Sequence, residues 1–265
     1  MTTWVLLRGW TREAGHWGAF PDAFGAGIGA ASVLCVDLPG CGTRRGERSP
    51  ADVEAIVESC RAVLRERGVA PPVHLLAMSL GAMVAIAWST RHPEEVEGAV
   101  LINTSVRGFG AWYRRLNLRQ SGRLLSALLS RDAEKIERNV LAMTSRRPRT
   151  DTDALVARWV AIRRERPVSR GNALRQLWAA ARFRVPMPPP RVPLLVLASR
   201  RDGLVDPRCS ERMAAAWNAP LVSHASAGHD LPLDDPEWVI AETAHWLAGA
   251  RHSDAPGHRR PAAER

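Results

Sequence analysis

The sequence lacks the features of membrane-spanning and exported proteins. None of its apolar runs approaches the roughly 18 residues that span a bilayer. The N-terminal stretch MTTWVLLRGW has no basic flank, long apolar region or small-residue cleavage site, unlike a signal peptide. The four cysteines are scattered, with none of the paired spacing of zinc sites. We therefore expect a cytoplasmic protein with reduced thiols, no metal and no membrane association.

Lysine is nearly absent, because 36 of the 37 basic residues are arginine. The net charge of +10 is unevenly placed: residues 107–191 hold 20 Lys and Arg against six Asp and Glu. That segment therefore carries +14, and the rest of the chain −4. Trp112 and Tyr113 lie among these arginines, but no nucleic-acid-binding motif accompanies them. We expect no nucleic acid partner, and keep both aromatic residues as substrate-binding candidates.

Short apolar runs alternate with helical patterns along much of the chain. Between the runs, helical patterns cover 49–68, begun by a serine cap, and 81–93, ended by Pro93. Such alternation predicts an α/β fold with a mostly parallel sheet of about six strands, flanked by helices. The runs that predict buried strands are 3–7, 32–38, 73–78, 98–103 and 193–199, with a last strand that contains His224.

The alternation stops between residues 106 and 191, where several arginine-rich helical patterns follow one another. This segment ends in VPMPPPRVP, which cannot continue a helix. We therefore expect a helical cap at 106–191 inserted into a core made of 1–105 and 192–249. Residues 250–265 have no apolar content to bury, and we expect a disordered tail there.

A serine stands at the corner between a predicted strand and a predicted helix, in Ala77-Met78-Ser79-Leu80-Gly81. A serine at the start of a helix often only caps it. A nucleophilic serine in a strained strand-to-helix turn instead needs small residues two positions away on each side. Ala77 and Gly81 meet this need, so both interpretations remain open for Ser79 on the local pattern alone.

A nucleophilic serine also needs an acid and a base later in the chain. Asp202 directly follows the strand at 193–199, whereas Asp206 is placed to cap the next helix. His229 lies in a loop between the last strand and the last helix, whereas His224 and His245 fall inside those elements. The ordered set Ser79, Asp202 and His229 predicts a catalytic triad.

Two alternative assignments have weaker support, a dinucleotide site at 25–30 and an acid at position 103. The stretch GAGIGA at 25–30 fits a dinucleotide-binding fingerprint, but it follows a predicted helix and precedes a strand, the reverse of the required order. Asn103, after the strand at 98–103, occupies the other customary position for the acid but is not a carboxylate. We expect no cofactor.

Four motifs together resemble the α/β-hydrolase family: the serine corner at 77–81, VDLPGCGTR at 36–44, RRDGLVDP at 200–207 and AGHDLPLDDPEWV from 227. The resemblance implies an oxyanion hole formed by the backbone N–H groups of Leu80 and Trp10. Arg8 departs from the family pattern, which usually has histidine there, and a buried arginine needs a carboxylate partner. Arg8 and Met78 are substrate-binding candidates, and packing is an equally good role for Met78.

The resemblance implies hydrolysis of a carboxylic ester by a Ser-His-Asp acyl-enzyme mechanism. Within the family the chain looks most like the pimeloyl-carrier-protein methyl ester esterases, in its Trp10, DLPG-x-G, Ser-Leu-Gly and DGLV motifs. The positive charge of 107–191 then predicts docking of an acidic acyl carrier protein or another anionic acyl substrate. A thioesterase, a carbon–carbon bond hydrolase and a non-catalytic ligand-binding relative are the alternatives.

Overall fold

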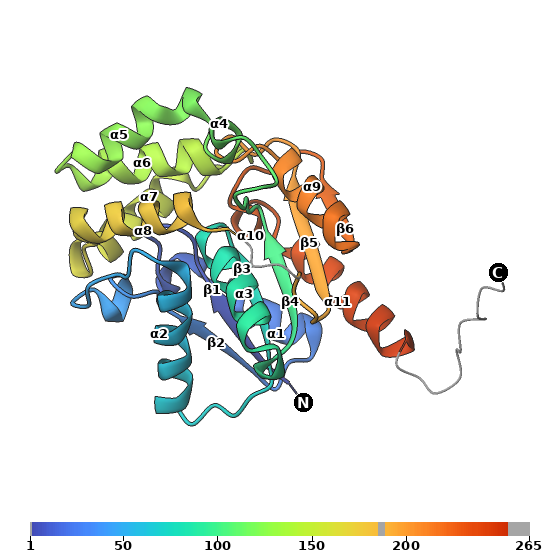
Figure 1. The fold of residues 1–265 in the computed structure, drawn as a ribbon. Helices are drawn as coiled ribbons and strands as arrows, with labels where there is room; N and C mark the ends of the chain where they lie inside the picture. The colour runs from blue at the N-terminus through green and yellow to red at the C-terminus, as the bar shows by residue number, and fades with distance from the viewer. Residues whose placement is uncertain (1, 185–188, 254–265) are drawn as a thin grey trace.

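A six-stranded parallel sheet forms the centre of the structure, a computed structural model that describes residues 2–184 and 189–253 (Figure 1). The strand order is β2-β1-β3-β4-β5-β6, and each neighbouring pair is parallel. The predicted α/β class and sheet of about six strands are confirmed. The strands are β1 (Thr3–Leu7), β2 (Ser32–Val36), β3 (Val73–Met78), β4 (Val96–Ile102), β5 (Leu194–Ser199) and β6 (Leu221–His224).

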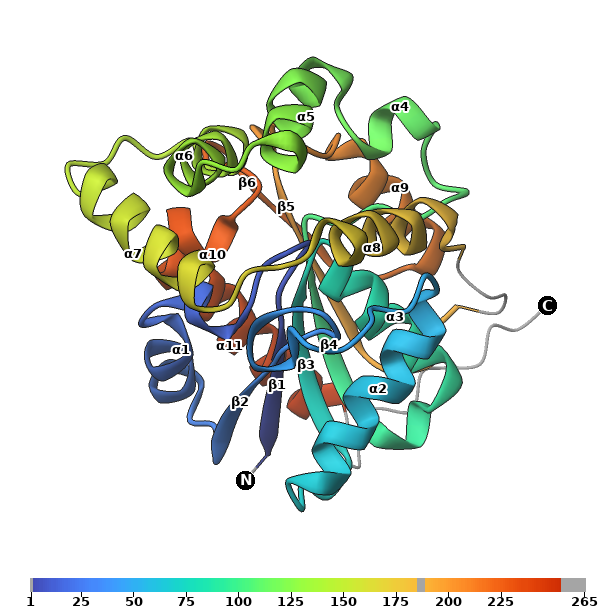
Figure 2. The same ribbon diagram turned by 90° about the vertical axis from the view of Figure 1, so that its left-hand side faces the viewer.

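Alternate residues of each strand face two separate apolar layers. In β3, Leu75 and Ala77 belong to the layer under α2 and α3, whereas Leu76 and Met78 belong to the layer under α1 and α11 (Figure 2). The run VHLLAM is continuously apolar except for His74 because both faces of this strand are covered. The core helices are α1 (Phe20–Ile28), α2 (Val53–Glu66), α3 (Leu80–Arg91), α9 (Arg208–Trp217), α10 (Leu231–Asp234) and α11 (Pro236–Ser253), with 3-10 turns η1 (Ala14–Trp17), η2 (Gly42–Arg44) and η3 (Pro93–Glu95).

Several predicted boundaries differ from the structure by a few residues, among them the start of α2 and the start of the C-terminal tail. Asp52, not Ser49, caps α2, and its side chain accepts a hydrogen bond of 3.1 Å from the backbone N of Ala55. Ser49 precedes Pro50, and a residue before proline is kept out of the helical region. At the other end of the chain, α11 continues to Ser253, beyond the expected start of the tail. Residues 254–265 lie outside the described residues.

The sequence analysis expected no dinucleotide site, no paired cysteines and no membrane-spanning helix, and the structure describes the segments concerned. The GAGIGA stretch forms the second half of α1 and its C-terminal cap, where Gly29 has φ 64°, so it does not join a strand to a following helix. Cys35, Cys41 and Cys60 are free thiols. None of the described helices is both long and apolar enough to cross a bilayer.

The strand order reverses between β1 and β3: from β1 the chain continues to β2 at one edge of the sheet, and from β3 it continues to β4 toward the other edge. Helix α1 follows β1 on one face, and α3 follows β3 on the other, although β1 and β3 are neighbours. The loops after these two strands therefore diverge and leave a crevice at the carboxyl ends of the strands. Residues 8–13 and Ser79 lie at this crevice.

Five helices between β4 and β5 form what we call the helical segment, which lies over the carboxyl ends of the strands (Figures 1 and 2). Ile136 and Leu141 pack against Leu155 and Trp159 in an apolar cluster of its own. The helical segment contains α4 (Trp112–Arg115), η4 (Leu118–Gln120), α5 (Ser121–Leu129), α6 (Ala133–Thr144), α7 (Thr152–Glu165) and α8 (Arg170–Arg182).

The connection between α6 and α7 is hydrogen-bonded to the loop after β6. The backbone N of Asp230 donates to Thr144 O at 2.8 Å. The Asp234 carboxylate accepts from Arg146 N at 2.9 Å and from Gly228 N at 2.7 Å. The helical segment is therefore held directly against the loop that contains His229.

A buried ion cluster joins the helical segment to the loop after β1. The Glu137 side chain, 0% exposed, lies 2.6 Å from Arg12 Nη1 and 2.5 Å from Arg163 Nε. The Arg12 guanidinium also stacks over Trp159, 4.2 Å from the ring centroid. Burial alone would raise the pKa of Glu137, but the two guanidiniums outweigh it and hold that pKa below its ordinary value.

Replacing Glu137 by Gln should lower the free energy of unfolding by about 3–5 kcal/mol, because it leaves two guanidiniums without their counter-charge. Urea denaturation at neutral pH measures this loss. Glu134→Gln is the matched control, since Glu134 lies on the same helix and pairs with Arg138 in solvent. That control should cost less than about 1 kcal/mol. The Glu137 contribution should also disappear as pH falls through its depressed folded-state pKa. Equal losses in the two variants would contradict a structural role for the cluster.

Candidate active site

Ser79 occupies the corner between β3 and α3 in a strained conformation. Its backbone has φ 55° and ψ −114°, a region that residues with a side chain rarely adopt. The residue stands at the N-cap position of α3, yet its hydroxyl makes no capping hydrogen bond. The structure therefore does not support the interpretation of Ser79 as a helix cap.

Glycine is required two residues after Ser79. A Cβ on Gly81 would lie 2.4 Å from Leu7 O and 2.6 Å from Arg8 O, so the start of α3 packs directly on the end of β1. On the other side, a Cβ on Gly9 would lie 3.2 Å from Ser79 Cβ. These close approaches bring the loop after β1 against the Ser79 side chain.

Asp202 lies in the turn after β5 and contacts His229. Its Oδ1 accepts hydrogen bonds from the backbone N of Leu204 at 2.7 Å and of Val205 at 2.9 Å. Its Oδ2 lies 2.7 Å from His229 Nδ1, and both side chains are almost fully buried. Asp206 instead accepts from the backbone N of Arg208, the first residue of α9, although the N-cap position itself is occupied by Pro207.

The other histidine near this loop has a different role. His224 ends β6, where its Nδ1 accepts from Ala227 N at 2.8 Å and its Nε2 lies 3.1 Å from Asp235 Oδ2. Asp235 also caps α11 through the backbone N of Trp238. The structure therefore brings His229, and not His224, to Asp202.

Ser79 and His229 line the same small cavity of about 50 Å³. Among the described residues, neither Ser79 Oγ nor His229 Nε2 has a hydrogen-bond partner. Catalytic hydrogen bonds are often long in unliganded enzymes and tighten when substrate binds. Both polar atoms are thus available to a molecule in this cavity.

The two predicted oxyanion donors flank Ser79. Leu80 begins α3, so its backbone N–H has no acceptor within the helix. Trp10 lies in the loop that contacts Ser79, and its indole Nε1 donates to Ala173 O in α8 at 2.8 Å. Across the described part of the chain, the backbone N–H of neither residue donates to a protein acceptor.

Arg8 has a carboxylate partner that the sequence alone does not identify. Its Nη2 and Nη1 lie 2.6 and 3.1 Å from the two oxygens of Asp230, the residue after His229. Its guanidinium also stacks over Trp17, 4.6 Å from the ring centroid. Burial would raise the pKa of Asp230, but Arg8 more than offsets this and lowers it. Arg8 therefore joins the loop after β1 to the His229 loop.

Asn103 has a positioning role that the sequence analysis missed. The residue is buried after β4 with φ 45°, and its Nδ2 donates to His229 O at 2.8 Å and to Ser199 Oγ at 2.9 Å. Its Oδ1 accepts from Ser199 N at 2.7 Å. An uncharged amide can bridge two loops in this way because it is both donor and acceptor. The only signal in the sequence was its position directly after a buried strand.

Gln176 of α8 was also missed. It is fully buried, its Oε1 accepts from the backbone N of Thr11 at 3.0 Å, and its Nε2 donates to Pro39 O at 3.2 Å. The DLPG turn and the loop after β1 are therefore both fixed from the helical segment. Nothing in the local pattern around Gln176 indicates this contact.

A larger cavity of about 280 Å³ extends from Ser79 beneath the helical segment. Most of its walls are apolar, with Leu80, Met83, Leu177, Leu204 and Val205 among them. Such a cavity suits an apolar group bound next to Ser79.

The remaining substrate-binding candidates lie in different surroundings. Met78 packs in the core layer under α1 and also lines the small cavity at Ser79. Tyr113 is 49% exposed on α4 and is not among the residues that line either cavity at Ser79. The side chain of Trp112 lies outside the described part of the structure.

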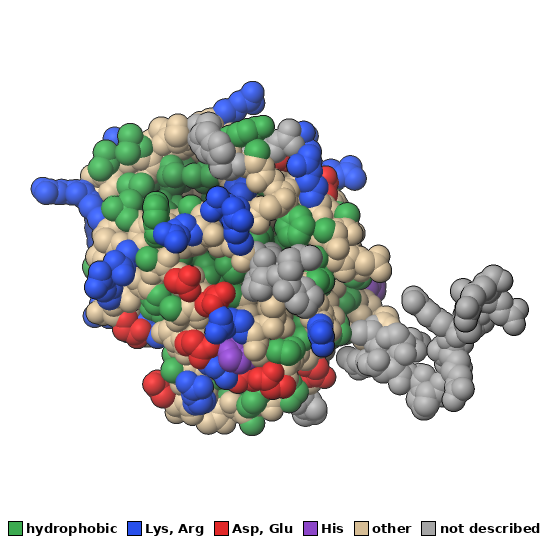
Figure 3. Space-filling view, in the orientation of Figure 1, with side chains coloured by type: hydrophobic (Ala, Val, Ile, Leu, Met, Phe, Trp, Pro, Cys, Tyr) green, Lys and Arg blue, Asp and Glu red, His purple; other side chains and the backbone are tan. Residues whose placement is uncertain are grey.

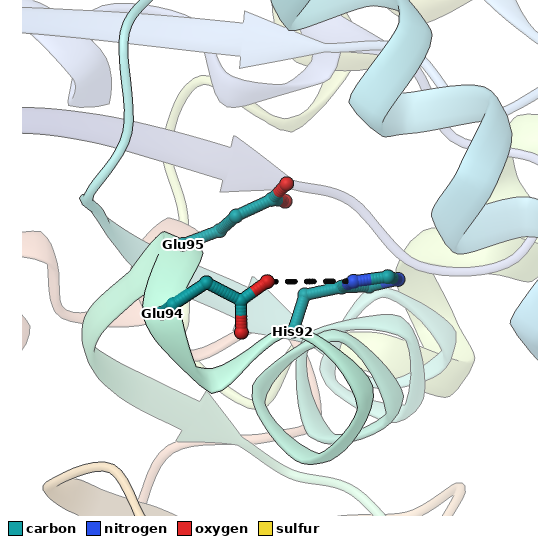
Figure 4. Close-up of side chains that lie close together, drawn as sticks. All are labelled: His92, Glu94 and Glu95. Atoms are coloured by element: carbon teal, nitrogen blue, oxygen red, sulfur yellow. Dashed lines mark ion pairs between the residues drawn. The ribbon is translucent and has the colours of Figure 1, made fainter.

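One group of described residues has the spacing of a metal site, namely His92, Glu94 and Glu95 (Figure 4). It lies at the start of β4, whereas Ser79 follows the end of β3, at the opposite edge of the sheet. The Glu95 carboxylate accepts from Arg61 Nε at 2.8 Å and Nη2 at 2.5 Å. The ligand oxygens of Glu95 are therefore already engaged by a guanidinium, which does not fit a metal site.

Comparison with known proteins identifies the family. No curated protein sequence matches the chain. Similar solved structures include a hydrolase from Pseudomonas aeruginosa, with 20% identity, a TM-score of 0.72 and 93% of this chain and 89% of that chain covered. A thermophilic esterase from Thermogutta terrifontis has 19% identity and a TM-score of 0.71, with 94% and 90% covered. The enol-lactonase from Burkholderia xenovorans has 17% identity and a TM-score of 0.74, with 93% and 91% covered.

At these identities the solved structures show a shared fold. The family model described as the alpha/beta hydrolase family matches residues 4–242, which is most of the chain. This protein belongs to the alpha/beta hydrolase family.

Proposed function

We propose that the protein is a serine hydrolase that cleaves carboxylic esters through an acyl-enzyme intermediate. The observation that carries the proposal is the contact of 2.7 Å between His229 Nδ1 and Asp202 Oδ2, in a cavity wall shared by His229 and the strained Ser79. The fold supports a hydrolase, and the esterase and lactonase among the similar structures are consistent with ester chemistry.

In the proposed mechanism His229 Nε2 accepts the proton of Ser79 Oγ as this oxygen attacks the ester carbonyl carbon. Asp202 holds the imidazole in the required tautomer and stabilises the imidazolium. The N–H groups of Leu80 and Trp10 bind the oxyanion, and the N-terminus of α3 adds a favourable dipole. The imidazolium then protonates the departing alkoxide. Water, activated by His229, cleaves the acyl-enzyme and restores the Ser79 hydroxyl.

The proposed substrate is an acyl ester whose apolar part occupies the cavity of about 280 Å³. In this proposal the helical segment acts as a cap that selects the substrate. More specifically, the proposed substrate is a methyl ester linked to an acyl carrier protein, since four motifs resemble those of the pimeloyl-carrier-protein methyl ester esterases. A thioesterase or carbon–carbon bond hydrolase would use the same residues.

A non-catalytic ligand-binding relative is the alternative from another class. A fluorophosphonate probe distinguishes it from an enzyme, because only an activated serine reacts with this probe. Labelling of Ser79, identified by peptide mass spectrometry, supports the hydrolase. An unlabelled, folded protein supports the ligand-binding alternative.

Replacing Ser79 by Ala should abolish hydrolysis of short p-nitrophenyl esters without unfolding the protein. Loss of the nucleophile of a triad typically lowers kcat by about 10⁶-fold. Alanine keeps the Cβ of serine, so it adds no backbone strain at this position. Steady-state kinetics and circular dichroism measure the two quantities. Retention of more than a few per cent of the activity would contradict the assignment of the nucleophile.

The two histidines near the loop after β6 should respond differently to substitution. His229→Ala should lower kcat by several orders of magnitude, because it removes the general base. His224→Ala should leave the kinetic constants of the folded protein nearly unchanged, although it removes the contacts with Asp235 and Ala227. Kinetics at a temperature where both variants stay folded makes the comparison. A larger loss of kcat in His224→Ala would reverse the assignment of the base.

The charge of the helical segment supports an anionic partner. Among the charged side chains over the helical segment in Figure 3, most are Arg or Lys, whereas most of the acidic side chains in this view lie over the core below it. The sequence places +14 in residues 107–191 and −4 elsewhere. A positive surface around a substrate channel raises the association rate of acidic proteins. An acidic carrier protein fits this pattern.

Hydrolysis of a carrier-linked methyl ester should depend strongly on salt. Its kcat/KM should fall steeply as ionic strength passes about 0.1 M, where the Debye length is about 10 Å. Hydrolysis of a small neutral ester should barely change and serves as the internal control. If both substrates have the same salt dependence, the charge of the helical segment plays no part in substrate binding.

A further inference from the structure

A third cavity in the helical segment has arginines in its wall. It measures about 350 Å³ and lies between the end of α5, the start of α6, the end of α7 and the start of α8. Arg131, Arg163 and Arg170 line it, and none of the described residues of its wall is acidic. This cavity is distinct from the two that Ser79 lines.

The three guanidiniums keep several N–H donors that no protein group uses. Arg163 contacts Glu137 through Nε, and no hydrogen bond is present at its two Nη atoms among the described residues. Arg170 donates from Nη2 to Leu129 O at 2.7 Å, which leaves Nη1 and Nε. Arg131 makes no hydrogen bond or ion pair with the described residues through its side chain. A planar guanidinium with free N–H groups matches the oxygens of a carboxylate or phosphate.

Apolar side chains complete the wall, although Arg131 and Arg170 are themselves exposed to solvent. Leu128, Ile136, Val140 and Val168 lie beside the arginines in this cavity. Beside this apolar wall an anion interacts more strongly with the half-buried guanidinium of Arg163 than it would on an open surface. A single carboxylate, Glu137, is shared by Arg12 and Arg163 behind the wall, so the cavity keeps an excess of positive charge.

Trp10 is a wall residue that this cavity shares with the two cavities at Ser79. Its side chain is fixed by the hydrogen bond from Nε1 to Ala173 O, and the residue lines all three cavities. Val140 lines both the arginine cavity and the small cavity that Ser79 and His229 share. The arginine cavity and the cavities at Ser79 are therefore neighbours that share Trp10 as a wall residue.

We propose that the cavity of Arg131, Arg163 and Arg170 is a subsite for an anionic group, a carboxylate or a phosphate, carried by the ester substrate. The proposal rests on the proposed function, and it adds to it the substrate class: esters with one apolar part and one anionic end. The apolar part occupies the cavity of about 280 Å³, and the anionic end lies on the other side of Trp10.

Binding of matched alkyl esters to the Ser79→Ala protein tests the subsite without hydrolysis. Each ester ends in a carboxylate, a phosphate monoester or an uncharged methylamide, on the acyl or the alcohol side, over a series of chain lengths. Isothermal titration calorimetry gives the Kd. The best anionic ester should bind about tenfold more tightly than its methylamide, as expected for charge-assisted hydrogen bonds. The tighter-binding of the two anions identifies the group.

The variants Arg131→Gln and Arg131→Gln with Arg170→Gln should lose this preference and keep the Kd of the methylamide. Among the described residues the exposed Arg131 side chain has no hydrogen bond or ion pair, so the single variant tests the subsite with little expected loss of stability. Arg164→Gln is the matched control, because Arg164 is exposed next to Arg163 and does not line the cavity. It should retain the preference.

Two outcomes would overturn the subsite: equal Kd values for the anionic and neutral esters, or an equal loss of preference in Arg164→Gln. The second outcome would mean that the general field of the helical segment, and not this cavity, attracts the anion. Hydrolysis of the methylamide ester by the protein with Ser79 reports on the proposed function separately. If that ester is bound but not hydrolysed, the hydrolase proposal fails while the binding data still decide the subsite.

Discussion

The buried ion pair between Arg8 and Asp230 joins the two loops on which the candidate active site depends. Arg8 lies one residue before Gly9, which packs against Ser79, and Asp230 lies one residue after His229. Because both ions are 3% exposed, either one alone would be left buried without its counter-charge. The pair therefore favours one relative position of the loop after β1 and the loop that contains His229. Asn103, directly after β4, supports the same arrangement through its hydrogen bond to His229 O.

The sequence predicted those features that local patterns determine. Nearly continuous apolar runs identified β1, β3 and β5, because strands covered on both faces have few polar positions. The exceptions are Thr3 and Ser199 at strand ends and His74, which stacks on Trp4. The corner at Ser79 and the turn at Asp202 were found because each follows such a strand directly. The boundaries of helices were predicted less accurately, since Asp52 caps α2 in place of the predicted Ser49.

Contacts between distant parts of the chain could not be predicted in the same way. Arg8 and Asp230 are separated by 222 positions, and Thr11 and Gln176 by 165. A buried polar side chain indicates that it needs a partner, but one sequence does not indicate which of many carboxylates or amides supplies it. The structure also shows that three separate cavities meet at Trp10, which no pattern of residue types reveals.

The helical segment is attached to the core more firmly at α6 and α8 than at α5. The connection after α6 is hydrogen-bonded to the His229 loop, and Gln176 ties α8 to the loop after β1. Helix α5, by contrast, has no buried residue, and it packs mainly against α6. Local opening has its lowest free-energy cost where the fewest apolar contacts are lost. Thermal fluctuations should therefore displace α5 first, which widens the access to Ser79 while His229 and the loop after β1 keep their positions.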